Sequence, residues 1–240
     1  MRRRAAPGKA NAVDVFAAVR MFLRYLAVEG RCRAGLEQAL PRLASWSQRR
    51  LPHVLPVENV ERLIASCDPT SKVGLRDRAI LLLLARLGLR AGDVAGLRLD
   101  DLCWEKASLR IVGKGGREAL LPVPQDVGDA ILAYLERGRP ATGSDYVFLR
   151  GLAPFRPLAS GGAISLVVRR ALGRAGVESP SRGSHLLRHS LASRLLREGA
   201  PLRGIAEVLR HKSVKTTIIY AKVDVDLLAR VAEPWPEVSR

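Results

Sequence analysis

The sequence predicts a mainly α-helical fold with one small antiparallel β-sheet, an α+β architecture. Apolar residues recur at helical spacing, or form long apolar runs, in several stretches. The stretches predicted to be helices are residues 13–28, 36–47, 57–67, 75–87, 125–137, 158–174 and 224–232. Two apolar runs, 109–112 and 119–123, flank a glycine-rich turn at residues 113–116 and predict a β-hairpin. A further short strand is expected at residues 146–149.

The chain is expected to consist of several parts in series. In order, these are a basic disordered arm (residues 1–10), a helical segment (11–50), an extended linker (51–56), a large domain (57–232) and a tail (233–240). Prolines in the linker disfavour a helix, and Gly88 suits a left-handed cap at the end of the preceding helix. The large domain is therefore expected to hold the hairpin and most of the helices.

Composition favours an ordered protein with an anionic partner. The 240 residues are 48% hydrophobic and 26% charged, so a sizeable core is expected. Lysine and arginine number 40 against 23 acidic residues, which gives a net charge of +17 and an isoelectric point near 11.0. Such an excess indicates a polyanion, with nucleic acid first and an anionic membrane surface second. Codon usage in a GC-rich genome is the alternative source of part of the arginine.

Cysteine usage and the N-terminus predict a cytoplasmic protein that does not enter a membrane. Cys32, Cys67 and Cys103 show no C-x-x-C spacing and no neighbouring histidine, so we expect buried thiols in a reducing compartment. No apolar segment follows the basic N-terminus, and the longest apolar run, residues 79–85, is too short to span a bilayer. The sequence shows no cluster of carboxylates of the kind that binds Mg²⁺ near the candidate catalytic residues described next, so we expect neither a metal nor another cofactor.

The stretch from His185 to Tyr220 carries the side chains that favour chemistry. It contains H-L-L-R-H, then L-R-H, then K-T-T-I-I-Y. His185 and Arg188 are three residues apart and share one face if the segment is helical, so both could approach the same anion. Together with His211 and Tyr220, they offer an anion clamp, two imidazoles that handle protons and an oxygen nucleophile.

The pattern H-x-L-R-H, then L-x-H, then Tyr resembles the C-terminal signature of the tyrosine recombinases, also called the phage-integrase family. The resemblance implies two further residues upstream, an arginine after a G-L pair and a lysine in a β-hairpin. Three residues after that arginine, Asp93 stands where the family usually has glutamate. The six family positions are filled in the expected order by Arg90, Lys114, His185, Arg188, His211 and Tyr220. The resemblance further implies the family's catalytic domain, preceded by a helical core-binding domain of which residues 11–50 would be a shortened remnant.

The residue types suit cleavage of a phosphodiester. Negative charge builds on the non-bridging oxygens during the reaction, and two fixed guanidiniums, which we assign to Arg90 and Arg188, would hold those oxygens. The phenol of Tyr220 would be the nucleophile; with an ordinary pKa of about 10, its ionisation at neutral pH costs about 4 kcal/mol. His185 is the candidate general base, in keeping with the resemblance, and His211 would hydrogen-bond a phosphate oxygen.

Three more residues have expected roles. The resemblance implies that Lys114 is the general acid that protonates the leaving 5′-hydroxyl. His189 is expected to be structural, behind the site, and Asp93 to orient Arg90 or to cap its helix. A covalent 3′-phosphotyrosyl bond would conserve the energy of the broken phosphodiester, so rejoining would need no ATP.

The resemblance implies a site-specific recombinase or integrase from a mobile element, which cuts and rejoins double-stranded DNA. It also implies a homo-tetramer on DNA, with an accessory DNA-bending protein or a partner recombinase as a further partner. Two alternatives stay open. One is a type IB topoisomerase-like activity, because the same chemistry on one strand relaxes supercoils. The other is an N-terminally truncated, inactive remnant that still binds DNA.

Overall fold

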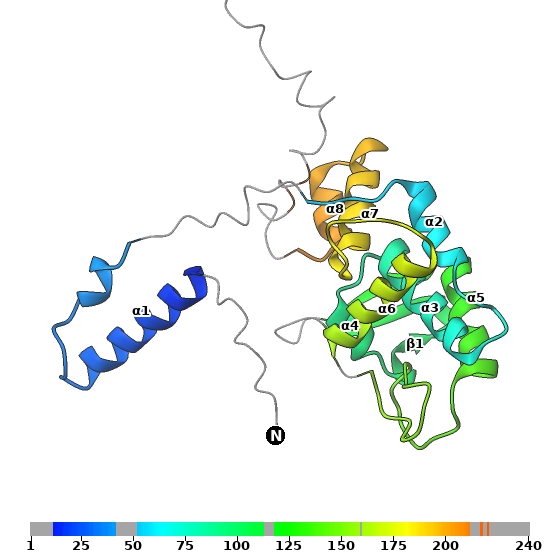
Figure 1. Cartoon of the computed structure of the whole chain (residues 1–240), viewed down its shortest axis with the longest axis horizontal. Helices are drawn as coiled ribbons and strands as arrows, with labels where there is room; N and C mark the ends of the chain where they lie inside the picture. Colours follow the sequence, from blue (N-terminus) through cyan, green and yellow to red (C-terminus); the bar gives the residue numbers. More distant parts are fainter. Residues whose placement is uncertain are drawn as a thin grey trace, which may run out of the picture. The chain divides into compact units, whose positions relative to one another are not determined.

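The computed structural model describes residues 12–41, 52–112, 118–158 and 160–211, together with Thr217 and Tyr220. The chain divides into two compact units, Met1–Arg50 and Leu51–Arg240, each with its own helices (Figure 1). None of the described helices combines the length and the apolar character that crossing a bilayer requires.

The first unit contains one long helix. This helix, α1 (Ala12–Val28), confirms the prediction for residues 13–28, and Gly30 follows its end with a φ of 70°. Exposed apolar side chains on α1 are Val15, Val19, Met21, Phe22, Tyr25 and Val28. None of the described residues 15–41 is fully buried, so this unit encloses no core within that range.

The helix predicted at residues 36–47 is wrong in its described part. Only a 3-10 turn, Leu36–Ala39, forms before Leu40 becomes extended. The cause is Pro41, because a residue that precedes proline disfavours the helical conformation. Arg20 holds the turn against α1 by donating hydrogen bonds to the carbonyl oxygens of Leu40 (3.1 Å) and Pro41 (2.7 Å). Residues 42–47 lie outside the described part of the chain.

The second unit is a helical body built around α3 (Lys72–Arg86), which is buried along most of its length. The surrounding helices are α2 (Val57–Ala65), α4 (Ala91–Ala95), α5 (Gln125–Ala133), α6 (Gly161–Arg174), α7 (His185–Arg197) and α8 (Leu202–Val208). α3 packs against α2, α4, α5, α6 and α7 (Figure 1). A continuous apolar core lies between these helices. These helices confirm the predictions for residues 57–67, 75–87, 125–137 and 158–174. The last turn of 125–137 is π-helical, and the helix predicted from residue 158 begins only at Gly161.

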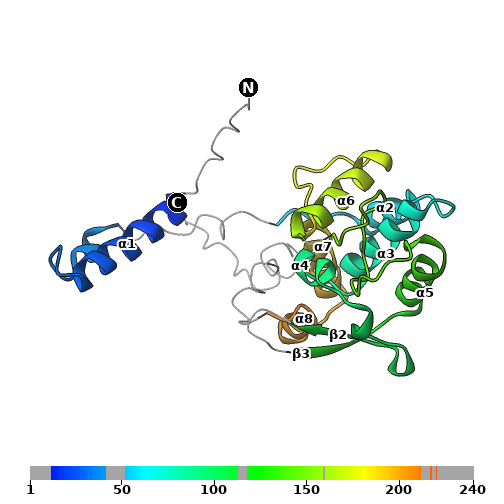
Figure 2. The same cartoon turned by 90° about the horizontal axis from the view of Figure 1, so that it is seen from below.

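A small antiparallel sheet completes the second unit. Its strands, in sheet order, are β1 (Leu102–Cys103), β2 (Ser108–Val112) and β3 (Glu118–Pro122). β2 and β3 form the predicted hairpin, with Leu109 opposite Leu121, and run side by side in Figure 2. β1 has only two residues, too few for an alternating pattern to reveal it. The hairpin turn, which holds Lys114, lies outside the described residues.

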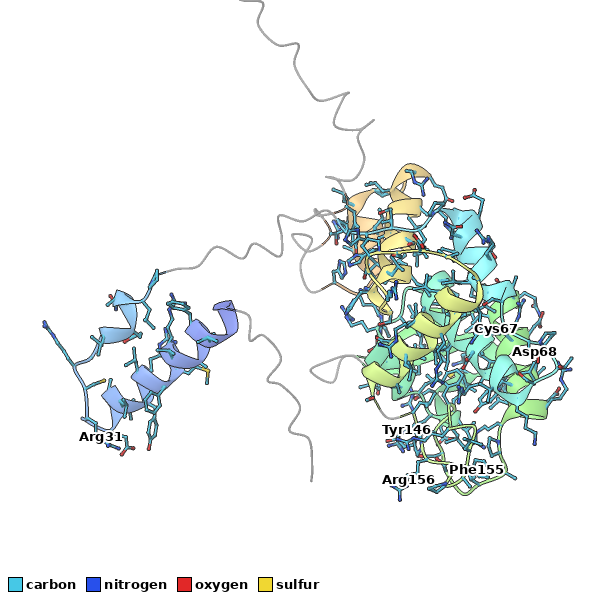
Figure 3. All side chains as sticks on the ribbon, in the orientation of Figure 1. Arg31, Cys67, Asp68, Tyr146, Phe155 and Arg156 are labelled. Atoms are coloured by element: carbon cyan, nitrogen blue, oxygen red, sulfur yellow. The ribbon has the colours of Figure 1, made fainter. Side chains whose placement is uncertain are left out.

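The strand predicted at residues 146–149 is wrong. The chain there makes isolated bridges, pairing Arg98 with Tyr146 and Leu149 with Pro157, rather than a ladder. The guanidinium of Arg98 lies 4.8 Å from the centre of the Tyr146 ring, which is labelled in Figure 3. Single main-chain hydrogen bonds, such as that from the Val147 N–H to the Leu97 carbonyl oxygen (2.9 Å), therefore hold this segment together with side-chain contacts.

The three cysteines are free, as predicted, but only one is buried. Cys67, labelled in Figure 3, is 4% exposed, and burial raises the pKa of its thiol. Cys32 and Cys103 are partly exposed, so the expectation of buried thiols is wrong for them. Cys32 lies in the first unit, where the described residues provide no core to cover it.

Two contacts position the helices that carry the candidate site. The backbone N–H of Leu55 donates to the buried Ser190 Oγ (2.8 Å), which fixes the start of the second unit against α7. Gly88 ends α3 with a φ of 58°, the predicted left-handed cap. A Cβ there would lie 2.8 Å from a methyl of Leu209 and 2.9 Å from one of Leu191. Only glycine therefore lets the end of α3 approach α7 and α8 this closely.

Candidate active site

Arg90 lies at the start of α4, just after the Gly88 turn. Its backbone is extended (φ −75°, ψ 150°), and its N–H donates to Asp93 Oδ2 at 3.1 Å. This contact confirms that Asp93 caps the helix that Arg90 begins. The guanidinium of Arg90 reaches the end of α8, where Nη2 donates to the carbonyl oxygen of Arg210 at 3.0 Å.

Arg188 projects from α7 and is 4% exposed. It donates one hydrogen bond to the carbonyl oxygen of Gly88 and another to that of Leu209. Burial, followed by the charge of Arg90, lowers the pKa of Arg188 to about 10, which still leaves the guanidinium protonated at neutral pH. A fixed, buried cation therefore lies within electrostatic reach of Arg90.

The turn that ends α8 supplies acceptors to both arginines. Leu209 caps the helix, and Arg210 follows in the left-handed conformation with a φ of 50°. The N–H of Arg210 donates to the Glu207 carbonyl oxygen, and that of His211 to the Ala206 carbonyl oxygen, both at 2.9 Å. This is the Schellman arrangement of a helix C-terminus. The consecutive carbonyls 209 and 210 thus face Arg188 and Arg90, and the partial negative charge of a helix C-terminus suits both cations.

An ion pair between Arg210 and Asp93 connects the turn after α8 to helix α4. Arg210 Nη2 lies 2.5 Å from Asp93 Oδ2, and the two side chains are only 13% and 12% exposed. The same carboxylate oxygen accepts the backbone N–H of Arg90. Asp93 therefore contacts both the segment that carries Arg90 and the turn that follows α8.

Tyr220 lies against two imidazoles. It is 2% exposed, and its hydroxyl is 2.9 Å from Nδ1 of His189. The ring of His211 is nearly parallel to the phenol ring, with centroids 6.4 Å apart, and its Nδ1 lies 2.7 Å from Thr217 Oγ1. Burial raises the pKa of Tyr220, and the positive charge of Arg188 opposes that rise.

The histidines of the site are neutral at pH 7. Burial, followed by the proximity of His185, lowers the pKa of His189 to about 4. Burial, followed by the charges of Arg188 and Arg90, lowers the pKa of His211 to about 4 and also lowers that of His185. A neutral imidazole carries a free lone pair. In the tautomer with its lone pair on Nδ1, His189 accepts the hydrogen bond from the Tyr220 hydroxyl.

Most of the predicted site residues come together in the second unit. Those that do are Arg90, His185, Arg188, His211 and Tyr220. Lys114 lies outside the described residues. Among those described, His185 makes no hydrogen bond to Tyr220, and its ring lies 6.2 Å from that of His189, between centroids.

Two residues gain importance from the geometry. His189, expected to be structural, is the histidine that contacts the phenol oxygen. Its position one helical turn after His185, and therefore on the same face, is the available sequence signal. Arg210 draws no attention in the sequence beyond its place next to His211, because a positive φ at a non-glycine residue cannot be read from the residue type.

Comparison with known proteins places the chain in a family. The model of the phage integrase family matches residues 53–226. This chain belongs to the phage integrase family. Like members of that family, it combines a helical body with a small sheet, and the predicted mainly α fold with an antiparallel sheet is confirmed.

Relatives in the family include integrases and recombinases. The chain is 46% identical over 222 residues to the putative integrase/recombinase y4rA of Sinorhizobium fredii, an alignment that covers 92% of this chain and 54% of y4rA. It is 38% identical over 236 residues to the tyrosine recombinase XerD of Mycobacterium tuberculosis, covering 95% and 74%. The chain thus spans about half the length of y4rA.

A solved structure shares the fold. The recombinase XerH, bound to its palindromic difH substrate in a post-cleavage complex, superposes with a TM-score of 0.68 at 24% identity. The match covers 84% of this chain and 58% of the XerH chain.

Proposed function

We propose that this member of the phage integrase family is a site-specific DNA recombinase from a mobile element. It would cut and rejoin double-stranded DNA through a covalent 3′-phosphotyrosyl intermediate. The observation that carries the proposal is the hydrogen bond between the buried phenol of Tyr220 and the neutral imidazole of His189, beside the guanidinium of Arg188. The net charge of +17 supports a polyanionic substrate.

Arg90 and Arg188 would hold the non-bridging oxygens of the scissile phosphate. A guanidinium has five N–H donors, and the bonds to carbonyl oxygens occupy only some of them. Donors therefore remain for the phosphate. Because the carbonyls fix both cations before substrate arrives, the site needs little reorganisation as charge develops.

The phenol oxygen of Tyr220 would attack phosphorus while its proton passes to His189. The distance of 2.9 Å lies within the range for proton transfer, and the low pKa of His189 keeps its lone pair available at neutral pH. Because the same low pKa makes this imidazole a weak base, the transfer also relies on the positive charge of Arg188, which favours the phenolate of Tyr220. His185 stays the competing prediction for the general base. His211 stays the predicted donor to a phosphate oxygen; with Nδ1 facing Thr217, its Nε2–H would make that bond.

The bond from phosphorus to the 5′-oxygen would break as the tyrosyl bond forms. Lys114 would give that oxygen a proton, a role that rests on the family resemblance. Attack of a 5′-hydroxyl on the phosphotyrosyl bond reverses these steps and reseals the strand. If that hydroxyl belongs to a second duplex, strands are exchanged, and the expected assembly is a homo-tetramer on DNA, with an accessory DNA-bending protein or a partner recombinase.

The test is the covalent intermediate itself. Wild-type protein, incubated with DNA that carries a candidate element end and without added divalent metal or nucleotide, is expected to form SDS-resistant adducts. Mass spectrometry of the digested adduct should find the nucleotide remnant on the peptide that contains Tyr220. DNA binding without adducts at such ends would instead favour the DNA-binding remnant, and relaxation of supercoils without strand exchange would favour the topoisomerase-like activity.

The substitution His189→Gln is expected to slow cleavage about a hundredfold, because the imidazole that accepts the phenol proton is lost.

In the wild type, the cleavage rate should stay constant as the pH falls from about 8 to about 6, where a histidine of ordinary pKa, about 6.5, would be mostly protonated. It should decline as the pH approaches the pKa of His189, about 4. Single-turnover cleavage across this range measures both effects.

His185→Gln is the matched control, since it changes the same residue type one helical turn away. If it causes the larger loss and His189→Gln stays near wild type, the base is His185. Circular dichroism at each pH separates lost chemistry from acid unfolding. Below about pH 6.5 the unfolded chain gains a proton that the folded His189 excludes, so stability falls as the pH drops toward 4.

A further inference from the structure

Arg210 occupies a backbone conformation that arginine rarely adopts. Its φ is 50°, and among the described non-glycine residues only Ala107 also has a positive φ. The position directly after a helix C-cap usually belongs to glycine, because a Cβ is strained there. A non-glycine residue persists in this conformation when surrounding contacts over-determine it, and such residues gather at functional sites.

The side chain of Arg210 points into the protein. It pairs with Asp93 at 2.5 Å, and its side chain is only 13% exposed. Its Nε is buried without a hydrogen-bond partner among the described residues, although most buried donors in proteins are paired. Both the backbone and the side chain of Arg210 are therefore held at some cost in free energy.

Arg90, Asp93 and Arg210 are joined in a ring of three contacts, which we call the Arg90 circuit. Asp93 accepts the Arg90 backbone N–H at 3.1 Å and also binds the Arg210 guanidinium. The carbonyl oxygen of Arg210 accepts the Arg90 guanidinium at 3.0 Å. Arg210 thus touches the Arg90 segment through its side chain and touches the Arg90 side chain through its backbone. The adjacent carbonyl, that of Leu209, accepts from Arg188.

We infer that Arg210 is a positioning residue that sets the place of the Arg90 guanidinium beside Arg188. The inference rests on the proposed function, in which these two cations hold one phosphate. The pair Asp93–Arg210 fixes the α8 turn against the start of α4. With that pair intact, the carbonyls of residues 209 and 210 present the two guanidiniums side by side. Without it, Arg90 keeps its charge but loses its defined place.

The test is Arg210→Gly, which removes the side chain and suits the positive φ. Glycine suits the turn and relieves the strain of the positive φ, which offsets part of the stability lost with the Asp93 pair, so the variant should stay folded at the assay temperature and the DNA dissociation constant should change little. The single-turnover cleavage rate should fall about tenfold, because a misplaced catalytic group slows the reaction even when binding is intact. Arg210→Lys should recover part of the rate, since an ammonium can still pair with Asp93. Arg203→Ala, which breaks the exposed Arg203–Glu207 pair on α8, is the matched control and should cleave like the wild type.

A double variant separates this circuit from a general effect of charge. Asp93→Asn keeps an oxygen for the Arg90 N–H but loses the charge that binds Arg210. The double variant Asp93→Asn with Arg210→Gly should then lose no more rate than the more affected single variant, because both substitutions break the same Asp93–Arg210 contact. A wild-type rate in Arg210→Gly, losses that multiply, or a rate loss explained by a lowered thermal midpoint would each overturn the inference.

A readout without activity distinguishes failure of this inference from failure of the proposed function. The side-chain Nε–H signal of Arg90 in a nitrogen–proton correlation spectrum can be assigned by its disappearance in Arg90→Lys. We expect that signal to shift in Arg210→Gly and to stay in place in Arg203→Ala, even if wild-type protein forms no adduct. An Arg90 signal that is the same in wild type and Arg210→Gly would rule the positioning role out.

Discussion

Tyr220→Phe is expected to abolish covalent DNA adducts while leaving the fold and DNA binding intact. The substitution removes the oxygen that we propose as the nucleophile and keeps the buried ring that stacks on His211. The loss of the hydrogen bond to His189 should cost about 1–3 kcal/mol of stability, because a partly buried nitrogen loses its partner. Adducts are counted by denaturing electrophoresis of labelled DNA, and binding is measured by mobility shift.

Tyr134→Phe is the control for that experiment. Tyr134 is 1% exposed, and its hydroxyl accepts a hydrogen bond from the Leu149 N–H at 3.2 Å, so this variant also removes one buried hydroxyl. It should form adducts at the wild-type level. Adducts that persist in Tyr220→Phe would mean that another residue is the nucleophile and that the proposed chemistry is assigned to the wrong oxygen.

Arg188→Ala should lower the cleavage rate about a thousandfold, the upper end of what one electrostatic donor contributes. It removes a buried cation that the carbonyls of Gly88 and Leu209 hold in place. Those carbonyls would lose their donor, so a fall in stability of about 1–3 kcal/mol for each is expected as well. Single-turnover kinetics and thermal unfolding measure the two effects separately.

Arg188→Lys keeps the test decisive if the alanine variant does not fold. An ammonium retains the positive charge but lacks the planar fork that contacts two carbonyls and a phosphate together. Its rate should therefore lie between those of the wild type and the alanine variant. Arg194→Ala changes an arginine on the same helix that pairs with Glu198 at 3.6 Å, and it should cleave normally. A rate in Arg188→Lys equal to that of the wild type would remove the fork from the mechanism.

The helices of the second unit are readable from sequence because their burial requires either periodic apolar positions or a long apolar run. α3 is the strongest case, since a long apolar run is required wherever a helix is surrounded on most sides. The failures have local causes. Pro41 stops a helix that apolar spacing alone would continue, and β1 is shorter than any pattern. Residues 146–149 have strand composition but find no neighbouring strand to pair with.

The candidate site is predictable in its residue types but not in its contacts. Spacing within one helix brings His185, Arg188 and His189 to the same region, so sequence reasoning identifies that group. The bond from Arg90 to Arg210 joins residues separated by 120 positions, which no local pattern reveals. Likewise, the choice between His185 and His189 depends on how Tyr220 approaches α7. The roles assigned to these side chains, and to Lys114, stay predictions until the variants are measured.

The acceptors that hold the two arginines are main-chain oxygens, and this has a consequence for how the site tolerates mutation. Every amino acid carries the same carbonyl, so no replacement at positions 88, 209 or 210 can delete an acceptor. A replacement acts instead by changing the direction of the peptide plane or, at position 210, also by removing the pair with Asp93. A proline or a β-branched residue is strained at a positive φ, so at position 88 it would turn an acceptor away from Arg188, and at position 210 it would turn the acceptor away from Arg90.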